Sequence, residues 1–170
     1  ADVLGAVDAA GIERLRFATS HPKDLTDEVI GLFATLPSLM PALHLPVQSG
    51  SNRILSAMNR RYTREHYLGL IEKLRRARPD IALTTDIIVG FPGETEENFM
   101  DTYRLVEEVG YSQVFTFIYS KREGTPAAEM DDDTPREVIQ ERFDRLVDLV
   151  QRKAFEANQA ELGATVPVLV

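Results

Sequence analysis

The chain has 170 residues, of which 44% are hydrophobic and 27% charged, and its formal net charge is -8 at pH 7. This hydrophobic content is enough for one packed domain, or a large piece of one, and excludes a disordered chain. The acidic balance argues against nucleic-acid binding through overall charge, and the absence of cysteine excludes disulfides, thiolate metal sites and a cysteine nucleophile within this chain.

The sequence also bears on where the protein works. No apolar run is long enough to cross a bilayer, and Ala1 opens no signal-peptide pattern. We therefore expect a cytoplasmic protein that makes no membrane contact. Residues 1–10 already have the pattern of a helix interior, and residues 166–170 have that of a strand that begins a new unit, so we expect a piece of a longer protein.

The first half of the chain alternates predicted helices and strands. A short helix ends at Gly11, and a strand is expected at residues 15–18. Thr26 is placed as the N-cap of the next helix, which leads to a strand expected at residues 42–47. A short helix and then a longer one, capped by Thr63, complete this half.

The second half contains the most distinctive stretch. A strand expected at residues 81–89 breaks into a glycine turn at residues 90–93, and Thr95 is placed as the N-cap of the following helix. A further strand is expected at residues 114–119. The last helix is predicted to run toward Leu162 from a capping box made of Thr134, Pro135 and Glu137.

Strands that alternate with helices predict an α/β fold with a parallel sheet. Four such units correspond to half of a TIM-like barrel or to an open doubly wound sheet. The chain has neither a GxGxxG nor a Walker A pattern, which argues against a dinucleotide-binding fold and against an NTPase.

Unusual polar residues follow the predicted strands, where α/β folds bind ligands. They are His21, Gln48 with Ser49 and Ser51, Asp86 with Glu94, and Tyr119 with Arg122. Arg122, in a glycine-containing loop, is the best single anion-binding candidate. His44 is interpreted as a satisfied core histidine, because it lies inside an apolar strand. No Ser-His-Asp or HExxH pattern occurs, no strand contains lysine and the three histidines are scattered, so we predict no catalytic nucleophile and no metal ligand in this chain.

Five segments resemble motifs of the radical-SAM methylthiotransferases, and they occur in the family's order. They are residues 19–22, 44–51, 58–60, 85–95 and 119–128. The form is similar to the MiaB-type branch, which acts on tRNA. The RimO-type branch, which modifies a ribosomal protein, usually differs at residues 48–51.

The resemblance implies a fold and a domain organisation. Residues 1–162 would be the C-terminal part of a radical-SAM barrel, an incomplete half of a partial TIM-type barrel, and residues 163–170 would begin an RNA-binding TRAM domain. The cysteines that hold the family's two [4Fe–4S] clusters would lie outside this chain, so we expect the fragment to be inactive alone.

The resemblance also implies a reaction and a site. In the family, a radical made from S-adenosylmethionine (SAM) removes a hydrogen from the adenine of an isopentenyl-adenosine next to the anticodon, and a methylthio group is inserted. The residues expected at SAM are Gln48, Ser49, Asp86, Ile88, Gly90, Phe91, Gly93, Glu94, Phe117 and Tyr119. Those expected nearer to the substrate are Ser51, Asn59, Arg60 and Arg122.

The implied partners are the anticodon loop of a tRNA and an electron donor such as flavodoxin or ferredoxin. Two alternatives stay open from the sequence. One is a RimO-type enzyme that modifies a ribosomal protein, and the other is a non-catalytic RNA-binding scaffold.

Overall fold

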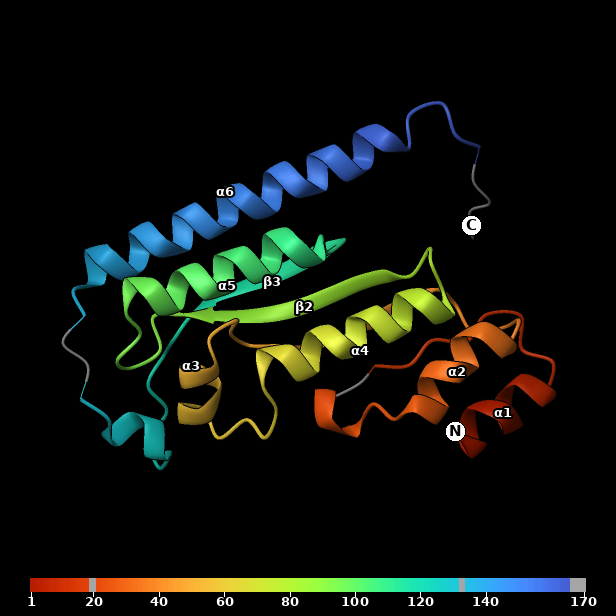
Figure 1. The fold of residues 1–170 in the computed structure, drawn as a ribbon, viewed down its shortest axis with the longest axis horizontal. Coiled ribbons are helices and arrows are strands. Elements are labelled where there is room, and N and C mark those ends of the chain that lie inside the picture. Colours follow the sequence, from red (N-terminus) through yellow and green to blue (C-terminus); the bar gives the residue numbers. More distant parts are fainter. Residues whose placement is uncertain (19–20, 132–133, 166–170) are drawn as a thin grey trace.

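A computed structural model describes residues 1–18, 21–131 and 134–165 of the chain. From α2 onward its helices and strands follow the predicted order (Figure 1). In chain order they are α1 (Asp2–Ala9), the 3-10 helix η1 (Pro22–Asp24), α2 (Asp27–Thr35), β1 (Ala42–His44), α3 (Asn52–Ala57), α4 (Arg64–Ala77), β2 (Ala82–Val89), α5 (Glu96–Val109), β3 (Gln113–Ile118), the 3-10 helix η2 (Pro126–Glu129) and α6 (Arg136–Ala160).

The described strands form a parallel sheet with β2 between β1 and β3. The predicted α/β class and parallel sheet are therefore confirmed. The strand predicted at residues 42–47 ends at His44. The Leu45 N–H still donates to the Thr84 carbonyl (2.8 Å), but the Val47 N–H donates to the Thr85 side-chain hydroxyl (2.9 Å) in place of a β2 carbonyl. Pairing resumes for one residue at Gln48, which bridges to Ile87.

The strand predicted at residues 15–18 is wrong. Leu15 makes a single parallel bridge to Leu39, and no ladder follows from it. The apolar alternation of this segment has another cause, because Phe17 packs against Phe33 with ring centroids 5.8 Å apart. Side-chain burial alone therefore produced a strand-like pattern here.

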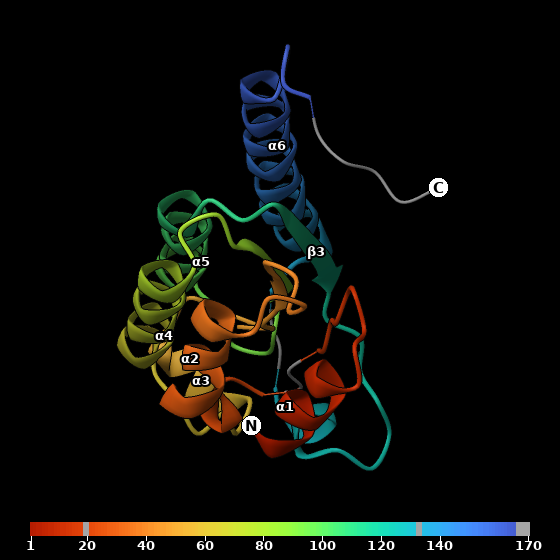
Figure 2. The same ribbon diagram turned by 90° about the vertical axis from the view of Figure 1, so that its right-hand side faces the viewer.

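The two faces of β2 have different environments. Leu83, Thr85, Ile87 and Val89 are buried beneath the helices, whereas the alternate residues on the other face stay partly exposed. The buried Thr85 hydroxyl is satisfied, since it donates to the Leu45 carbonyl (3.0 Å) and accepts from the Val47 N–H (2.9 Å). Figure 2 shows α4 and α5 together on one side of the strands, with α6 beside α5 and over β3.

Helix caps place the connections around this sheet. Thr26, Thr63 and Thr95 are N-caps as predicted, and Gly110 ends α5 in the left-handed conformation. The last helix begins one residue later than predicted, with Pro135 at the N-cap.

The predicted TRAM segment, residues 163–170, is only partly described. Residues 163–165 contain no strand, and residues 166–170 lie outside the described part of the chain. The same holds for residues 19 and 20 of the first family motif. No helix in the described ranges is both long and apolar enough to cross a membrane.

Candidate functional site

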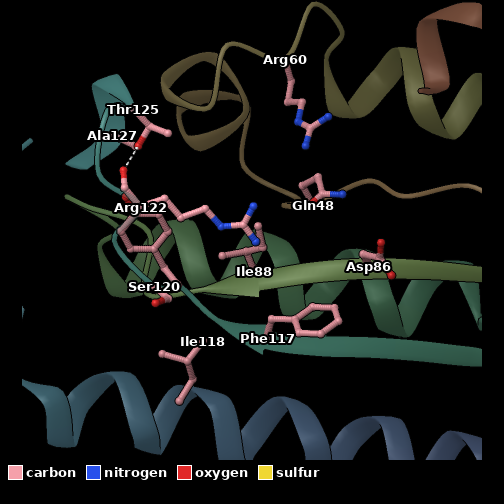
Figure 3. A pocket seen from close by; sticks show the side chains of 11 residues that line it. Gln48, Arg60, Asp86, Ile88, Phe117, Ile118, Ser120, Arg122, Thr125 and Ala127 are labelled. Atoms are coloured by element: carbon pink, nitrogen blue, oxygen red, sulfur yellow. Dashed lines mark hydrogen bonds between the residues drawn. The ribbon is translucent and has the colours of Figure 1, made fainter. Parts of the chain in front are cut away.

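A cavity of about 600 Å³ opens on the sheet face that the helices leave uncovered, near the carboxyl ends of β2 and β3. Figure 3 shows its side chains, which come from β2 and β3, from the loops after β1, α3 and β3, and from η2. The lining residues are Gln48, Arg60, Asp86, Ile88, Phe117, Ile118, Tyr119, Ser120, Arg122, Thr125 and Ala127. Seven of the residues predicted from the sequence are among them: Gln48, Arg60, Asp86, Ile88, Phe117, Tyr119 and Arg122.

Strand register explains the floor of this cavity. Asp86 and Ile88 lie two residues apart on β2 and therefore face the same side, and Ile88 is paired with Phe117 on β3. Phe117 is 52% exposed, which is unusual for a large apolar side chain on a strand. The floor thus combines an apolar surface with one carboxylate.

Gln48 forms one wall and is held in a strained conformation. Its φ is +71°, in the left-handed region that non-glycine residues rarely adopt. Two backbone hydrogen bonds fix it to β2, one from its N–H to the Asp86 carbonyl and one from the Ile88 N–H to its own carbonyl, each 2.9 Å. A strain of this kind, held by surrounding bonds, is characteristic of binding sites.

Arg60 enters the cavity from the loop after α3. That loop turns at Asn59, whose φ of +56° ends the helix as a left-handed residue. The Tyr62 hydroxyl connects this loop to the segment that carries Gln48, because it donates to the Val47 carbonyl (3.0 Å). Arg60 Nε is buried and has no hydrogen-bond partner within the described residues, so the cavity holds an unsatisfied cationic donor.

Tyr119 and Arg122 line the cavity from the segment after β3. The Tyr119 ring packs edge-on against Phe91, with centroids 5.1 Å apart, and its hydroxyl is buried without a partner in the described part of the chain. Arg122 is exposed in a turn that the Thr125 hydroxyl closes by donating to the Arg122 carbonyl (2.8 Å) (Figure 3). Arg122 and Arg60 therefore bring two cations to the cavity, Arg122 from an exposed turn and Arg60 from a half-buried position.

His44 lies on the open face of the sheet, which corrects its interpretation as a core residue. Its Nδ1 is 2.8 Å from the Thr84 hydroxyl, and its Nε2 is 3.5 Å from an Asp86 carboxylate oxygen. The cause of the error is strand alternation, because β1 and β2 bury only one of their faces. His44 is satisfied, as expected, but by contacts beside the cavity.

Several predicted site residues lie outside the lining. Ser49 and Ser51 are buried against α5, where Ser49 Oγ lies 3.2 Å from Thr102 Oγ1 and Ser51 Oγ accepts from Asn98 Nδ2 (3.1 Å). The others outside it are Asn59, Gly90, Phe91, Gly93 and Glu94, and His21 also lies outside it. These residues shape the loops that carry the lining.

Glu94 has an environment that the sequence did not reveal. Its carboxylate is buried and accepts a hydrogen bond from the Gly90 N–H (2.9 Å), and an oxygen lies 3.7 Å from Arg142 Nη1 on α6. Burial raises the pKa of Glu94 to about 7, since desolvation outweighs the Gly90 hydrogen bond and the Arg142 charge. The sequence did not predict Arg142 as the partner of Glu94, because the two residues are 48 positions apart and no local pattern links them.

The geometry suits binding more than acid–base or metal chemistry. Among the described residues no group of three or more His, Asp or Glu side chains could hold a metal ion. The cavity offers an apolar floor, one carboxylate, two guanidinium groups and two buried donors without partners. This set suits a ligand that combines a flat apolar ring with hydroxyl groups and an anionic end.

Comparisons with known proteins identify the family of the chain. Residues 2–106 match the Radical SAM superfamily. A protein named tRNA-2-methylthio-N(6)-dimethylallyladenosine synthase from Thermobifida fusca is 56% identical over 94% of the chain, and proteins of the same name from Caldicellulosiruptor saccharolyticus and Alkaliphilus oremlandii are 58% and 54% identical over 94% and 100% of it. The matches cover 32%, 34% and 36% of those proteins, so the chain spans about a third of their length.

A solved structure shows the same fold. It is the coproporphyrinogen III oxidase HemN from Escherichia coli, described as a radical SAM enzyme, with a TM-score of 0.64 and 18% identity over 78% of this chain and 31% of that one. The family match over more than half of the chain, together with the similar proteins of one name, confirms the resemblance drawn from the sequence motifs, and the solved enzyme shows the fold. This chain belongs to the radical SAM superfamily.

Proposed function

We propose that this chain forms the SAM-binding wall of a tRNA methylthiotransferase, which adds a methylthio group to isopentenyl-adenosine next to the anticodon. The observation that carries the proposal is the lining of the cavity, in a chain more than half identical to proteins named for this activity. The complete enzyme would bind two [4Fe–4S] clusters through cysteines outside these 170 residues, because none occurs within them.

The chemistry of the lining fits SAM group by group. Ile88 and Phe117 present apolar surface for an adenine ring, and Asp86 presents a carboxylate that can accept hydrogen bonds from ribose hydroxyls. Arg60, expected from the sequence on the substrate side, fits better as the partner of SAM's carboxylate, since its buried Nε lacks a partner in the described residues. Gln48 is fixed beside Asp86, and its side chain can hydrogen-bond with either the ribose or the carboxylate of SAM.

The contribution of this chain itself is to position SAM and to exclude water from the cavity. SAM, when bound beside its cluster, supplies the hydrogen-removing chemistry and the methyl group. The strained Gln48 and the backbone bonds around it hold the wall in place before the ligand arrives. Ser49, Gly90, Gly93 and Glu94 support this wall from behind, which is the role we assign to them in place of direct contact.

The outer part of the cavity is the side we assign to the RNA. Arg122 lines the cavity from an exposed turn and can meet a phosphate or a base edge of the anticodon loop. We further propose that the reaction takes place in the cytoplasm and draws electrons from a reduced flavodoxin or ferredoxin.

The test uses the full-length protein with reconstituted clusters, SAM, a reducing system and tRNA that carries isopentenyl-adenosine. Mass spectrometry of the digested tRNA should detect the methylthio nucleoside. A methylthio group on a ribosomal protein instead would favour the RimO-type alternative. A full-length protein that binds tRNA but no iron, and forms no methylthio product, would favour the RNA-binding scaffold.

A further inference from the structure

The first two turns of α6 clamp the loop that follows β2. Arg142 Nη1 donates to the Glu94 carbonyl (2.9 Å) and lies 3.7 Å from a Glu94 carboxylate oxygen, while Arg142 Nε donates to Glu96 (3.1 Å). The Arg142 and Glu94 side chains are only 7% and 1% exposed. A buried charge pair with this many hydrogen bonds fixes the geometry of the groups it joins.

A second contact from the same helix reaches the turn itself. Gly90 has a φ of +73°, and a Cβ at this position would lie 2.5 Å from Ile139 Cγ2. The α6 side chain therefore lies directly against the glycine backbone, and the Gly90 N–H is held from the other side by the Glu94 carboxylate (2.9 Å). Ile139 and Arg142 together leave this turn one position to occupy.

The clamped turn continues directly into the cavity. Gly90 follows Ile88 by two residues, and the Val89 carbonyl between them accepts from the Tyr119 N–H (2.8 Å). A shift of the turn would therefore move Ile88 on β2 and Tyr119 beyond β3, which both line the cavity.

We propose that Arg142, acting through Glu94 and Gly90, is a positioning residue that makes α6 set the shape of the SAM cavity. The inference rests on the proposed function, because the ligand it names is SAM. It places Glu94 behind the cavity wall, where it orients the backbone and does not touch the ligand.

The chain offers a matched control on the same helix. Arg145 also pairs with Glu96 (2.8 Å), but its side chain is 37% exposed and it makes no hydrogen bond to the β2 turn in the described contacts. Removing Arg145 takes away the same charge from nearly the same place and leaves the hold on Glu94 intact.

The experiment measures equilibrium SAM binding to the full-length, cluster-reconstituted protein for the wild type, Arg142→Leu and Arg145→Leu. We expect Arg142→Leu to weaken SAM binding at least about tenfold, because small displacements of a positioned wall are costly, and Arg145→Leu to change it less than about twofold. Equal affinities for the wild type and Arg142→Leu, or equal losses in the two variants, would overturn the inference. A wild-type protein that does not bind SAM would overturn the proposed function as well.

A second measurement does not need SAM. Hydrogen exchange of residues 90–94 should be faster in Arg142→Leu than in Arg145→Leu, since the Gly90 amide loses its fixed acceptor. Unchanged exchange would overturn the clamp itself. Should Arg142→Leu fail to fold, Ile139→Ala releases the same turn with the ion pair left in place, and both measurements are repeated on it with the same expected directions.

Discussion

Asp86 provides the carboxylate in the described lining of the cavity, and its position is defined by strand register and by His44 beside it. We expect Asp86→Asn to weaken SAM binding by the full-length protein about 30-fold, because a hydrogen bond to a charged group is worth about 2 kcal/mol. Equilibrium binding of SAM checks this. Asp80→Asn is the control, since that carboxylate is exposed and pairs with Arg78 (2.8 Å) away from the cavity. Unchanged affinity in Asp86→Asn would remove it from the site.

Gly90 has no room for a side chain, because its backbone is left-handed and Ile139 lies against it. We expect Gly90→Ala to cost about 2–4 kcal/mol of unfolding free energy, from the left-handed backbone and from the contact with Ile139. Gly110→Ala has a φ of +60° with open space around it, so it should cost only about 1 kcal/mol. Denaturant unfolding of both variants measures the two losses of unfolding free energy, and their difference is the contribution of the contact with Ile139. Equal losses would mean that Ile139 moves aside.

At the scale of elements, the burial of Glu94 in the turn after β2 gives the fold a pH dependence. The pKa of Glu94 is raised from its ordinary value of 4.5 to about 7, so the folded state holds this proton more tightly than the unfolded chain does. Ionisation of Glu94 therefore lowers stability as pH rises through this window. The raised pKa makes this carboxylate a cost at neutral pH, although its contacts orient the turn.

The Glu94→Gln variant tests this dependence. Its unfolding free energy relative to the wild type should increase between pH 5 and pH 8, by about 3 kcal/mol for a shift of this size. Denaturant midpoints at a series of pH values provide the measurement. Glu97→Gln, which changes an exposed carboxylate in the adjoining first turn of α5, should follow the wild type within about 0.5 kcal/mol at each pH. Parallel curves for Glu94→Gln and the wild type would contradict the raised pKa.

At the scale of the whole molecule, the local charge of the cavity differs from the net charge of the chain. The chain carries a net charge of -8, yet two arginines line the cavity. RNA binding by this part of the enzyme would therefore depend on local cations and on charge supplied by other domains.

The Arg122→Ala variant of the full-length protein should bind tRNA more weakly, and the slope of its log affinity against log salt should fall by about 1, as expected for one lost phosphate contact. Filter binding at several salt concentrations measures the slope. Arg76→Ala is the matched control, because Arg76 is exposed on α4, pairs with Glu72 and is not among the residues that line the cavity. An unchanged slope in Arg122→Ala would place the RNA elsewhere.

Local signals predicted much of the fold. The threonine caps at residues 26, 63 and 95 and the glycine end of α5 were readable because capping depends on neighbours within one turn. The strand expected at residues 15–18 failed because its apolar pattern arises from Phe17 packing on Phe33, and no partner ladder extends beyond Leu15. Backbone pairing is a long-range property, which a short apolar pattern does not specify.

By itself, the sequence determined the α/β class from its alternating elements, and its resemblance to a known family indicated the superfamily and seven residues that line the cavity. Convergence at one edge of a parallel sheet accounts for four of them, Gln48, Asp86, Tyr119 and Arg122, whereas Arg60, Ile88 and Phe117 came from the resemblance alone. Only the tertiary structure decided which face each strand buries, and so moved His44 from the core to the open face and Ser49 and Ser51 from the cavity to α5. It also paired Glu94 with Arg142, a contact between residues 48 positions apart. Such pairs are set by how helices pack on a sheet, and no local spacing in the chain encodes them.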